Sequence, residues 1–437
     1  MQRGTGDDPS PRWRYELGEQ IATGVHLVRW ILLGALAGAL AGVASWAFLT
    51  VLDHVTRTRL DHEWLIWFLP VAGLVIGAVY HYVGGRSGQG NTLLIDEIHE
   101  PTDWVPRRMA PLVLVGTWAT HLFGGSAGRE GTAIQMAGSL TDAASRVLRL
   151  GEDDRRMMLI AALAGGFGSV FGVPLAGAVF ALEVQSIGRV KYEALVPALA
   201  ASIVGDQVVR SLGYHHALQQ HIVHAPSFGT LAKIAVAGIA FGVAGAAFAE
   251  LAHFITSQMR RRVSWPPLRP VVGGVAIVGL AVLFGHDYLG LSTPLATRAL
   301  SGEHLTFAVF ALKLLFTAIT LGCAFPGGEV TPLFVMGATL GSALAAPLGV
   351  DARTLAAIGF VAVFAGAANT PLACTVMGAE LFGSSAVVGF AVGCVVAYVF
   401  SNHRSIYASQ RVEAAKHGQP ISGAIRLDAW RMRKKRA

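Results

Sequence analysis

Long uncharged runs of apolar residues dominate the chain, and their lengths match the thickness of a lipid bilayer. Residues 31–52 carry no charge and are long enough to form one membrane-spanning helix. A second span is predicted at 64–80. Two further runs, 157–182 and 354–379, are uncharged throughout, yet glycine and proline interrupt both. We interpret these two runs as pairs of short or broken helices rather than as single spans.

The rest of the hydrophobic pattern predicts more spanning helices. The run at 109–128 is uncharged but ends in a glycine cluster. Additional spans are expected near residues 192–212, 229–256, 270–285, 304–322 and 381–401. No polar segment is long enough to predict a soluble regulatory domain. The pattern therefore indicates an all-α polytopic membrane protein.

Composition supports this fold class and excludes a soluble protein. The chain is 53% hydrophobic and only 14% charged, whereas soluble domains carry about 25% charged residues. Its 52 glycines in 437 residues are about 12%, against a usual ~7%, and glycine allows helices to approach closely or to break. The three cysteines lie in apolar stretches and indicate neither a disulfide framework nor a metal site. We expect no cofactor.

The positive charges predict the orientation in the membrane. Arg12, Arg14 and Arg29 precede the first span, and a basic cluster closes the chain. The positive-inside rule then places both termini in the cytoplasm. Residues 1–26 form a cytoplasmic segment, and 411–437 form a basic cytoplasmic tail that faces lipid rather than nucleic acid.

An internal repeat divides the membrane region. The motif Pro-Leu-Ala-Gly at 174–177 is followed by Glu183, and Pro-Leu-Ala-Cys at 371–374 is followed by Glu380. Each glutamate lies nine residues after its proline. The repeat predicts two halves, 27–220 and 229–410, whose sequence leaves an inverted or a parallel relation open. Repeats with broken apolar segments at matching positions are typical of secondary transporters, which are not enzymes.

The glycine-rich segment 124–132, Gly-Gly-Ser-Ala-Gly-Arg-Glu-Gly-Thr, predicts a helix that begins inside the membrane. Such a helix start exposes free N–H groups and the positive end of the helix dipole, which together form an anion site. Glu130 lies in the predicted first turn. Its carboxylate can occupy the anion site, and protonation would release that site, so one residue can exchange a proton for an anion. The alternative is an ordinary helix-start carboxylate.

Two other glycine-rich segments carry candidate anion ligands. The equivalent segment of the second half, 325–332, offers the Thr331 hydroxyl, which is alternatively an ordinary helix cap. Its Glu329 is either a structural acid or a direct participant in transport. The segment 85–91 ends in Asn91, whose amide can donate to an anion, although Gly-Asn is also a simple turn signal.

Several other polar residues have competing interpretations. Lys313, in an apolar run, either supplies a positive field to an anion or extends to the membrane interface. Glu183 and Glu380 fit a structural role that caps backbone N–H groups. The histidines that follow the 192–212 span are interpreted as loop residues rather than metal ligands; they are His215, His216, His221 and His224.

A different class of function is a membrane-embedded serine hydrolase. Residues 124–128, Gly-Gly-Ser-Ala-Gly, fit the Gly-x-Ser-x-Gly pattern, and His121 is near in sequence. That pattern requires a strand before the serine, and the sequence predicts no strand there. We therefore disfavour this interpretation.

Taken together, the motifs resemble the CLC family of anion channels and anion/proton exchangers over residues 27–410. The segment 128–131 is similar to the family's gating-glutamate motif, and Gly165 to Glu183 is similar to its second hallmark. The resemblance implies the CLC fold of two inverted repeats, with broken helices that meet at a midplane anion site, and a homodimer. It further implies that Glu130 is the gate and proton carrier, and that anions contact Asn91, Gly128, Arg129, Gly131, Thr331 and Tyr407. Glu329, Thr132 and Lys313 are secondary candidates.

Departures from the chloride-handling members indicate the fluoride-exporting bacterial branch. The first anion-binding stretch, 90–94, has no serine, and Thr132 replaces a proline. The second-half motif reads Gly-Gly-Glu-Val-Thr-Pro at 327–332, and Val184 stands where many chloride exchangers carry an internal proton glutamate. The resemblance thus implies a fluoride/proton antiporter of a bacterial inner (plasma) membrane, which exports fluoride from the cytoplasm and is driven by inward proton movement. A chloride/proton exchanger or a passive anion channel of the same fold is the alternative.

Overall fold

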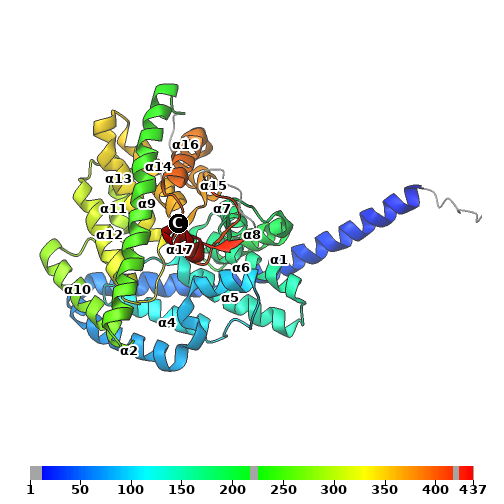
Figure 1. The fold of residues 1–437 in the computed structure, drawn as a ribbon, viewed down its shortest axis with the longest axis horizontal. Helices are drawn as coiled ribbons and strands as arrows, with labels where there is room; N and C mark the ends of the chain where they lie inside the picture. The colour runs from blue at the N-terminus through cyan, green and yellow to red at the C-terminus, as the bar shows by residue number, and fades with distance from the viewer. Residues whose placement is uncertain (1–11, 217–224, 417–422, 437) are drawn as a thin grey trace, which may run out of the picture.

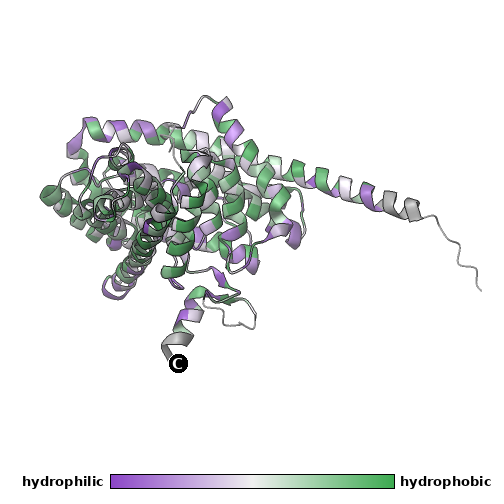
Figure 2. Cartoon of the chain, turned by 90° about the horizontal axis from the view of Figure 1, so that it is seen from above, coloured by the Kyte–Doolittle hydropathy of each residue, from purple (hydrophilic) through white to green (hydrophobic). Residues whose placement is uncertain are grey.

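The computed structural model describes residues 12–216, 225–416 and 423–436, and helices form most of it (Figure 1). Within these residues, four helices are long and apolar enough to cross a membrane by length and composition, among them α9 (Phe228–Arg262) and α13 (Val330–Leu348). Hydrophobic residues, green in Figure 2, are frequent along the helices of the body, and the first helix extends beyond that body at its N-terminal end. This arrangement agrees with the predicted membrane protein.

The first half of the described chain holds eight α-helices before the 213–227 connection. They are α1 (Arg12–Asp61), α2 (Leu69–Val79), α3 (Asn91–His99), α4 (Met109–Leu122), α5 (Glu130–Val147), α6 (Glu152–Phe171), α7 (Pro174–Glu183) and α8 (Leu195–Ser211). The second half repeats this order with α9, α10 (Leu268–Phe284), α11 (Thr293–Leu300), α12 (Phe307–Gly322), α13, α14 (Ala352–Ala368), α15 (Pro371–Phe382) and α16 (Val387–Phe400).

The two halves also pack in the same way. Helix α1 packs on α6 and α8, and its counterpart α9 packs on α14 and α16. Across the boundary, equivalent helices meet each other, α2 against α10 and α7 against α15. The aromatic rings of Phe167 and Phe364, which hold equivalent positions in α6 and α14, stack with centroids 6.1 Å apart. The two halves are therefore related by a pseudo-two-fold operation.

Hydrogen bonds at the ends of α7 and α15 show that the repeats are inverted. Glu183, at the end of α7, accepts from the backbone N–H groups of Leu372 and Ala373 at the start of α15, at 3.1 and 2.8 Å. Glu380 accepts reciprocally from the first turn of α7, at 2.9 and 2.7 Å. Each helix thus ends where its equivalent begins, so the two run antiparallel. The predicted capping role of both glutamates is confirmed, with each capping the helix of the opposite half.

The two long interrupted runs are broken as predicted, at equivalent positions. Gly172 separates α6 from α7 with a φ of +72°, and Asn369 separates α14 from α15 with a φ of +59°. Glycine and asparagine tolerate this left-handed conformation, and a proline two residues later starts the next helix. The predicted span at 64–80 lies within Glu63–His99, a helical segment long and apolar enough to cross a membrane. A 3₁₀ helix (Glu63–Phe68) precedes α2, because Pro70 in the first turn of α2 favours a new helix start.

The basic tail is partly folded onto the first half. Strand β2 (Arg411–Val412) pairs in parallel with β1 (Ser186–Ile187) and antiparallel with β3 (Ile425–Arg426), which leads into α17 (Leu427–Arg436). This small sheet adds a minor strand element to the predicted all-α architecture. It connects the residues just after Tyr407 to the residues just after α7.

Candidate functional site

The glycine-rich segments of the two halves meet at the centre of the molecule. Gly128 and Gly328 form an antiparallel bridge, in which each backbone N–H donates to the other's carbonyl, at 2.7 and 3.0 Å. Helix α5 begins two residues after Gly128, and α13 begins two residues after Gly328. The bridge therefore holds the N-terminal ends of α5 and α13 next to one another.

The Glu130 carboxylate occupies the N-terminus of the opposite helix. Oε1 accepts from the Val330 N–H at 2.6 Å, while Oε2 accepts from the Thr331 N–H at 3.2 Å and the Thr331 hydroxyl at 3.0 Å. The Arg129 N–H also donates to Oε2, at 3.0 Å. The side chain is completely buried. Sequence reasoning placed the carboxylate at the start of its own helix, whereas the inverted repeat places it at the start of α13.

Glycines make room for this carboxylate. A Cβ atom at Gly328 would overlap Oε1 of Glu130, and one at Gly128 would lie 2.7 Å from Oε2. A Cβ at Gly131 would approach the Gly328 Cα to 3.1 Å. Any side chain at Gly328 would therefore displace the carboxylate. The glycines at these positions predicted a helix start. The structure adds that the Glu130 carboxylate fills the space that a side chain at Gly328 would need.

One cavity, the Tyr407 cavity, reaches the start of α13 at Glu329. It holds about 410 Å³ and is lined by Asn91, Gln135, Glu329 and Tyr407, among others. The Tyr407 hydroxyl and the Asn91 side-chain oxygen are buried and find no hydrogen-bond partner among the described residues. The Asn91 amide nitrogen lies 3.4 Å from where a Gly131 Cβ would be. The structure thus places Asn91, Tyr407 and Glu329 in the wall of one cavity, whereas Thr331 lines another.

A second cavity, the Arg129 cavity, shares no lining residue with the first. It holds about 370 Å³ and is lined by Arg129, Thr331, Asp53, Tyr214 and the loop histidines His215 and His216, among others. The Arg129 guanidinium lies over the Phe171 ring, 5.6 Å from its centroid. Burial and the positive charge of Arg129 lower the pKa of His216 to about 4, so this ring is neutral at pH 7. The remaining histidines of the predicted loop group, His221 and His224, lie outside the described residues.

Two secondary candidates lie away from the carboxylate. The Thr132 hydroxyl bonds to the Thr117 hydroxyl on α4 at 2.6 Å. Lys313 is completely buried and donates to Ser126, Ser292 and the carbonyls of Tyr288 and Gly290. The interpretation that Lys313 extends to the membrane interface is therefore wrong, because the surrounding loops enclose its ammonium group.

The Ser126 environment does not fit a hydrolase. Its hydroxyl accepts from Lys313 at 2.9 Å, and serine–lysine pairs occur in some hydrolases. Here both side chains are fully buried, and neither lines the Tyr407 cavity or the Arg129 cavity. His121 instead faces the Gly128 carbonyl, with 3.4 Å between Nε2 and the oxygen. A substrate has no route to the serine through either cavity.

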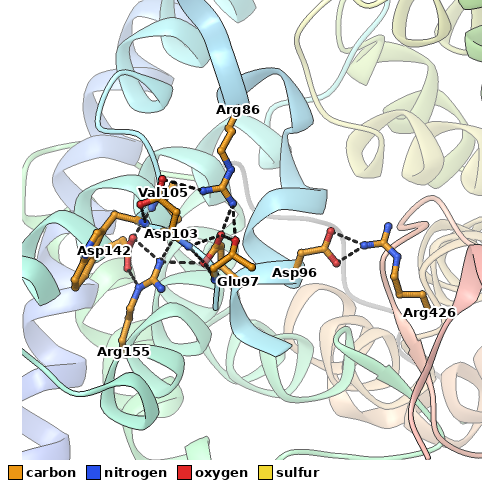
Figure 3. A network of polar contacts seen from close by, with 10 residues as sticks. Arg86, Asp96, Glu97, Asp103, Val105, Asp142, Arg155 and Arg426 are labelled. Atoms are coloured by element: carbon orange, nitrogen blue, oxygen red, sulfur yellow. Dashed lines mark hydrogen bonds and ion pairs between the residues drawn. The ribbon is translucent and has the colours of Figure 1, made fainter. Parts of the chain in front are cut away.

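A buried polar network that the sequence did not reveal fixes the helices that carry Asn91 and Glu130 (Figure 3). Arg155 on α6 bonds to Asp142 on α5 at 2.6 Å and to Glu97 on α3 at 3.3 Å. Arg86, just before α3, also bonds to Glu97. Asn91 is the first residue of α3, and Glu130 is the first residue of α5. The charged residues follow no spacing motif, so only the fold pairs them.

The C-terminal tail also contacts α3, through Arg411 and Arg426. Arg426 on β3 makes two 2.7 Å bonds to Asp96, visible in Figure 3, and Arg411 on β2 pairs with Asp96 at 3.3 Å. The segment around Tyr407 is fixed too, because Gln410 donates to the Val184 carbonyl at 2.6 Å and the Ala368 carbonyl at 2.8 Å. Val184 itself is buried, and at this position the chain presents a backbone carbonyl rather than an acid.

Fold and site together define a membrane protein whose two inverted repeats join at a buried, glycine-lined carboxylate. Comparison with known proteins agrees. Residues 72–402 match the family model for the voltage gated chloride channel. The chain is 45% identical over 423 residues to a chloride/fluoride channel protein of Pseudomonas syringae pv. tomato, covering 95% of this chain and 93% of the relative.

Two further comparisons place the fold. A crystal structure of a CLC-type fluoride/proton antiporter matches with a TM-score of 0.86 at 35% identity, covering 88% of this chain and 98% of that one. The H(+)/Cl(-) exchange transporter ClcA of Vibrio parahaemolyticus is 25% identical over 378 residues, covering 78% of this chain and 79% of the relative. The chain belongs to the CLC family of anion channels and exchangers. It is therefore a membrane transport protein rather than an enzyme.

Proposed function

We propose that this protein is a fluoride/proton antiporter that exports fluoride, with Glu130 as gate and proton carrier. The observation that carries the proposal is the position of the Glu130 carboxylate. It fills the N-terminus of α13, where Glu329 lines the Tyr407 cavity and Thr331 lines the Arg129 cavity. A helix N-terminus stabilises a carboxylate and a small anion for the same reason, since both accept its free N–H groups.

The Glu130 carboxylate and fluoride compete for the N-terminus of α13, and this competition couples fluoride movement to proton movement. The ionised carboxylate occupies the donors of Val330 and Thr331 and excludes an anion. When a proton binds Glu130, the acid loses its charge and most of its attraction to these donors. A fluoride can then take its place, and the protonated side chain can release its proton elsewhere. Fluoride binding therefore requires protonation of Glu130, because the carboxylate and the fluoride compete for the same N–H donors.

The donors around the site suit fluoride. Fluoride is small and strongly hydrated, so it needs compact donors at short range to replace its water. The Thr331 hydroxyl, the Asn91 amide, the buried Tyr407 hydroxyl and the backbone N–H groups of Val330 and Thr331 are of this kind. Arg129 lines the other cavity, and Gly128 leaves room beside the carboxylate. We propose that Gly128, Arg129 and Gly131 also contact the anion. The names of the 45% identical relative and of the 35% identical structure also favour fluoride.

The distribution of positive charge indicates which cavity faces the cytoplasm, and therefore the direction of fluoride transport. Arg260 and Arg269 line the Tyr407 cavity, and the basic tail begins four residues after Tyr407. Under the positive-inside rule this cavity faces the cytoplasm and the Arg129 cavity faces outside. Fluoride then leaves through the Tyr407 cavity toward Arg129 while protons enter. We further propose a homodimer in a bacterial inner membrane, with repeats at 27–220 and 229–410 and both termini in the cytoplasm.

The second candidate is chloride/proton exchange or passive anion flow. One similar protein is named a channel and another a chloride exchanger. The absence of an acid at Val184 argues against a proton route of the chloride type. Val184 is buried, and its carbonyl is occupied by Gln410.

Reconstituted vesicles test the proposal. Efflux from vesicles loaded with fluoride or chloride is followed with anion-selective electrodes while external pH is recorded. We expect fluoride to leave much faster than chloride and to drive protons in the opposite direction. Equal rates for the two anions would assign the protein to the chloride branch. Fluoride flow without any proton movement would make it a channel.

A further inference from the structure

An apolar groove, the α2–α4 groove, lies between two helices of the first half. It holds about 530 Å³ and is lined by apolar side chains of α2 and α4 and by the ring of Tyr80. Val75 on α2 and Val115 on α4 line it and are 58% and 59% exposed, so the groove opens to the surface. Both helices are apolar elements of the membrane region. The open side of the groove therefore faces lipid.

Helices α2 and α4 run in opposite directions along the groove. A Cβ atom at Gly124, just after α4, would lie 3.3 Å from the Ile66 side chain, just before α2. The groove follows α2 from Phe68 to Tyr80, a length of about 18 Å at a rise of ~1.5 Å per residue. One leaflet of a bilayer supplies ~15 Å of hydrocarbon, half of the ~30 Å core. A single lipid acyl chain that lies along the two helices therefore matches the groove in length.

Two arginines lie at the Tyr80 end of the groove. Arg107 and Arg108 directly precede α4, and both are exposed. A Cβ atom at Gly85, just after the π-helical turn that continues α2, would lie 2.5 Å from Arg108 Nη2. The Arg108 guanidinium is thus next to the end of both helices that form the groove. Within the described residues, no carboxylate lies within ion-pairing distance of Arg107 or Arg108.

A polar depression extends from these two arginines along the surface. It holds about 640 Å³, and the exposed Arg146 at the end of α5 also lines it. The depression contains two acids, but both already have partners. Asp103 pairs with Arg86 at 3.5 Å. Asp142 pairs with Arg155 at 2.6 Å. The depression therefore presents an excess of positive charge to an anionic group.

The charged end of the groove lies on the face that carries the basic tail. Helix α3 bonds to the tail through Asp96 and Arg426 at 2.7 Å (Figure 3), and residues 100–108 connect the end of α3 to α4. In the proposed orientation this face is cytoplasmic. The cytoplasmic leaflet carries anionic headgroups, which attract arginines placed at the membrane surface.

We propose that the α2–α4 groove binds one anionic phospholipid of the cytoplasmic leaflet. One acyl chain lies between the helices, and the headgroup phosphate contacts Arg107 and Arg108. Within a bilayer an apolar groove gains little by exchanging one hydrocarbon chain for another, so the headgroup decides which lipid is preferred. Arginine binds phosphate through paired N–H groups, and a zwitterionic lipid adds an ammonium group that the arginines repel.

The bound lipid would contact the surroundings of the transport path without lying on it. Tyr80 lines both the α2–α4 groove and the Tyr407 cavity. Gly116 also lines the groove, and a Cβ atom there would lie 2.7 Å from Cγ of Pro326, in the glycine-rich segment before α13. An acyl chain in the groove therefore packs against a side chain that also forms the wall of the anion cavity.

Removal of the charge is the first test. Arg107→Gln combined with Arg108→Gln leaves the groove open but removes both headgroup contacts. The matched control combines Arg261→Gln with Arg262→Gln, two adjacent exposed arginines at the end of α9 that line neither the groove nor the depression. Both double variants change the net charge by the same amount, so a difference between them reports the position of the charge.

Filling the groove is the second test. Val115→Trp places a large ring in the groove and leaves both arginines unchanged. Val282→Trp on α10 is its control, because Val282 is 64% exposed and does not line the groove.

Native mass spectrometry of the detergent-purified full-length protein counts bound lipid after addition of phosphatidylglycerol or phosphatidylcholine with identical acyl chains. For wild type and both controls we expect a preference of roughly fivefold or more for phosphatidylglycerol, from two arginines beside an anionic headgroup. The preference should disappear in the double variant at 107 and 108, and one bound phosphatidylglycerol should be lost in Val115→Trp. Inorganic phosphate at the same concentration should not displace the lipid, because it cannot occupy the groove.

Three results would overturn the proposal. The first is equal binding of the two lipids by wild type. The second is an unchanged preference in the double variant at 107 and 108 or, should that variant not fold, an unchanged phosphatidylglycerol count in Val115→Trp. The third is a change of oligomeric state in Val115→Trp with lipid binding intact, which would make the groove an interface between chains. The measurement requires no transport, so its outcome is independent of whether the vesicles exchange fluoride for protons.

Discussion

The starts of α5 and α13 have similar backbone arrangements, but the acids Glu130 and Glu329 beside them make different contacts. Both helices follow a glycine-rich segment, and the two segments pair through Gly128 and Gly328. Glu130 crosses the boundary and binds the N-terminus of α13. Glu329, the acid of the second segment, lies one residue before the start of its own helix and lines the Tyr407 cavity instead. The inverted repeat thus supplies two facing helix N-termini, and one of them receives the carboxylate of the other half.

This difference shows how a symmetric fold acquires a direction. A pseudo-two-fold arrangement with identical side chains would present the same chemistry to both cavities. Here the Arg129 cavity contains Arg129, Thr331 and neutral His216, whereas the Tyr407 cavity contains Asn91, Glu329 and Tyr407. The following predictions test this asymmetry, beginning with the largest expected effect.

Glu130→Gln should abolish proton-coupled fluoride movement. The amide retains the shape of the side chain but cannot carry a proton, and a missing proton-transfer group costs about 10²–10⁴-fold in rate. Proton uptake driven by a fluoride gradient in vesicles measures the effect. Glu193→Gln, which changes an exposed glutamate far from the bridge, is the control and should behave as wild type. Continued proton pumping by Glu130→Gln would refute the gating role.

Gly328→Ala should displace the Glu130 carboxylate, because its Cβ would overlap Oε1. We expect coupled fluoride flux to fall by about one to two orders of magnitude, which corresponds to roughly 1.4–2.8 kcal/mol. The control is Gly229→Ala, where no atom lies within 4 Å of the added methyl. Wild-type flux in Gly328→Ala would show that the carboxylate position seen here is not needed for transport.

Arg155→Gln should destabilise the first half, since Asp142 and Glu97 would lose a buried partner. Breaking one side of a buried ion pair costs about 3–5 kcal/mol. Arg156→Gln is the matched control, because its bond to exposed Asp153 is worth about 0–1 kcal/mol. Thermal melting of the detergent-solubilised proteins compares the two. Equal melting temperatures for both variants would remove the structural role assigned to this network.

Glu183→Gln and Glu380→Gln test whether the reciprocal caps are equivalent. Each substitution weakens two charge-assisted hydrogen bonds to a helix start, at about 1.5–3 kcal/mol for a bond to a charged group. Glu183 is 7% exposed, and Glu380 is only partly buried. We therefore expect Glu183→Gln to lower the melting temperature more. The opposite order would mean that burial does not decide the strength of these caps.

Asn91→Ser should give the smallest effect, a severalfold loss of preference for fluoride over chloride. The shorter side chain withdraws a donor from the Tyr407 cavity but leaves Glu130 and its bonds to α13 unchanged. The ratio of fluoride to chloride efflux in vesicles measures it. Gln135→Ala, at another position in the wall of the same cavity, serves as a comparison. An unchanged ratio in Asn91→Ser would exclude Asn91 from anion selection.

Much of the fold was readable from the sequence because bilayer-spanning runs, glycine breaks and repeated motifs are local signals. The breaks at Gly172 and Asn369 followed from glycine and proline positions. The short helix α11 was not predicted, since eight residues carry too little periodicity to stand out. The inversion of the repeats also required the structure, because motif order is the same in inverted and parallel repeats.

The sequence by itself determined that Glu130, Thr331, Asn91 and Tyr407 are unusual polar residues at glycine-rich or terminal positions of an apolar chain. Only the tertiary structure decided which helix receives the Glu130 carboxylate. The donors of Val330 and Thr331 lie some 200 residues away in sequence, at 200 and 201 positions. The contacts of Lys313 and Arg155 were likewise decided by the tertiary structure, because no local sequence pattern encodes the long-range contacts that enclose a buried charge.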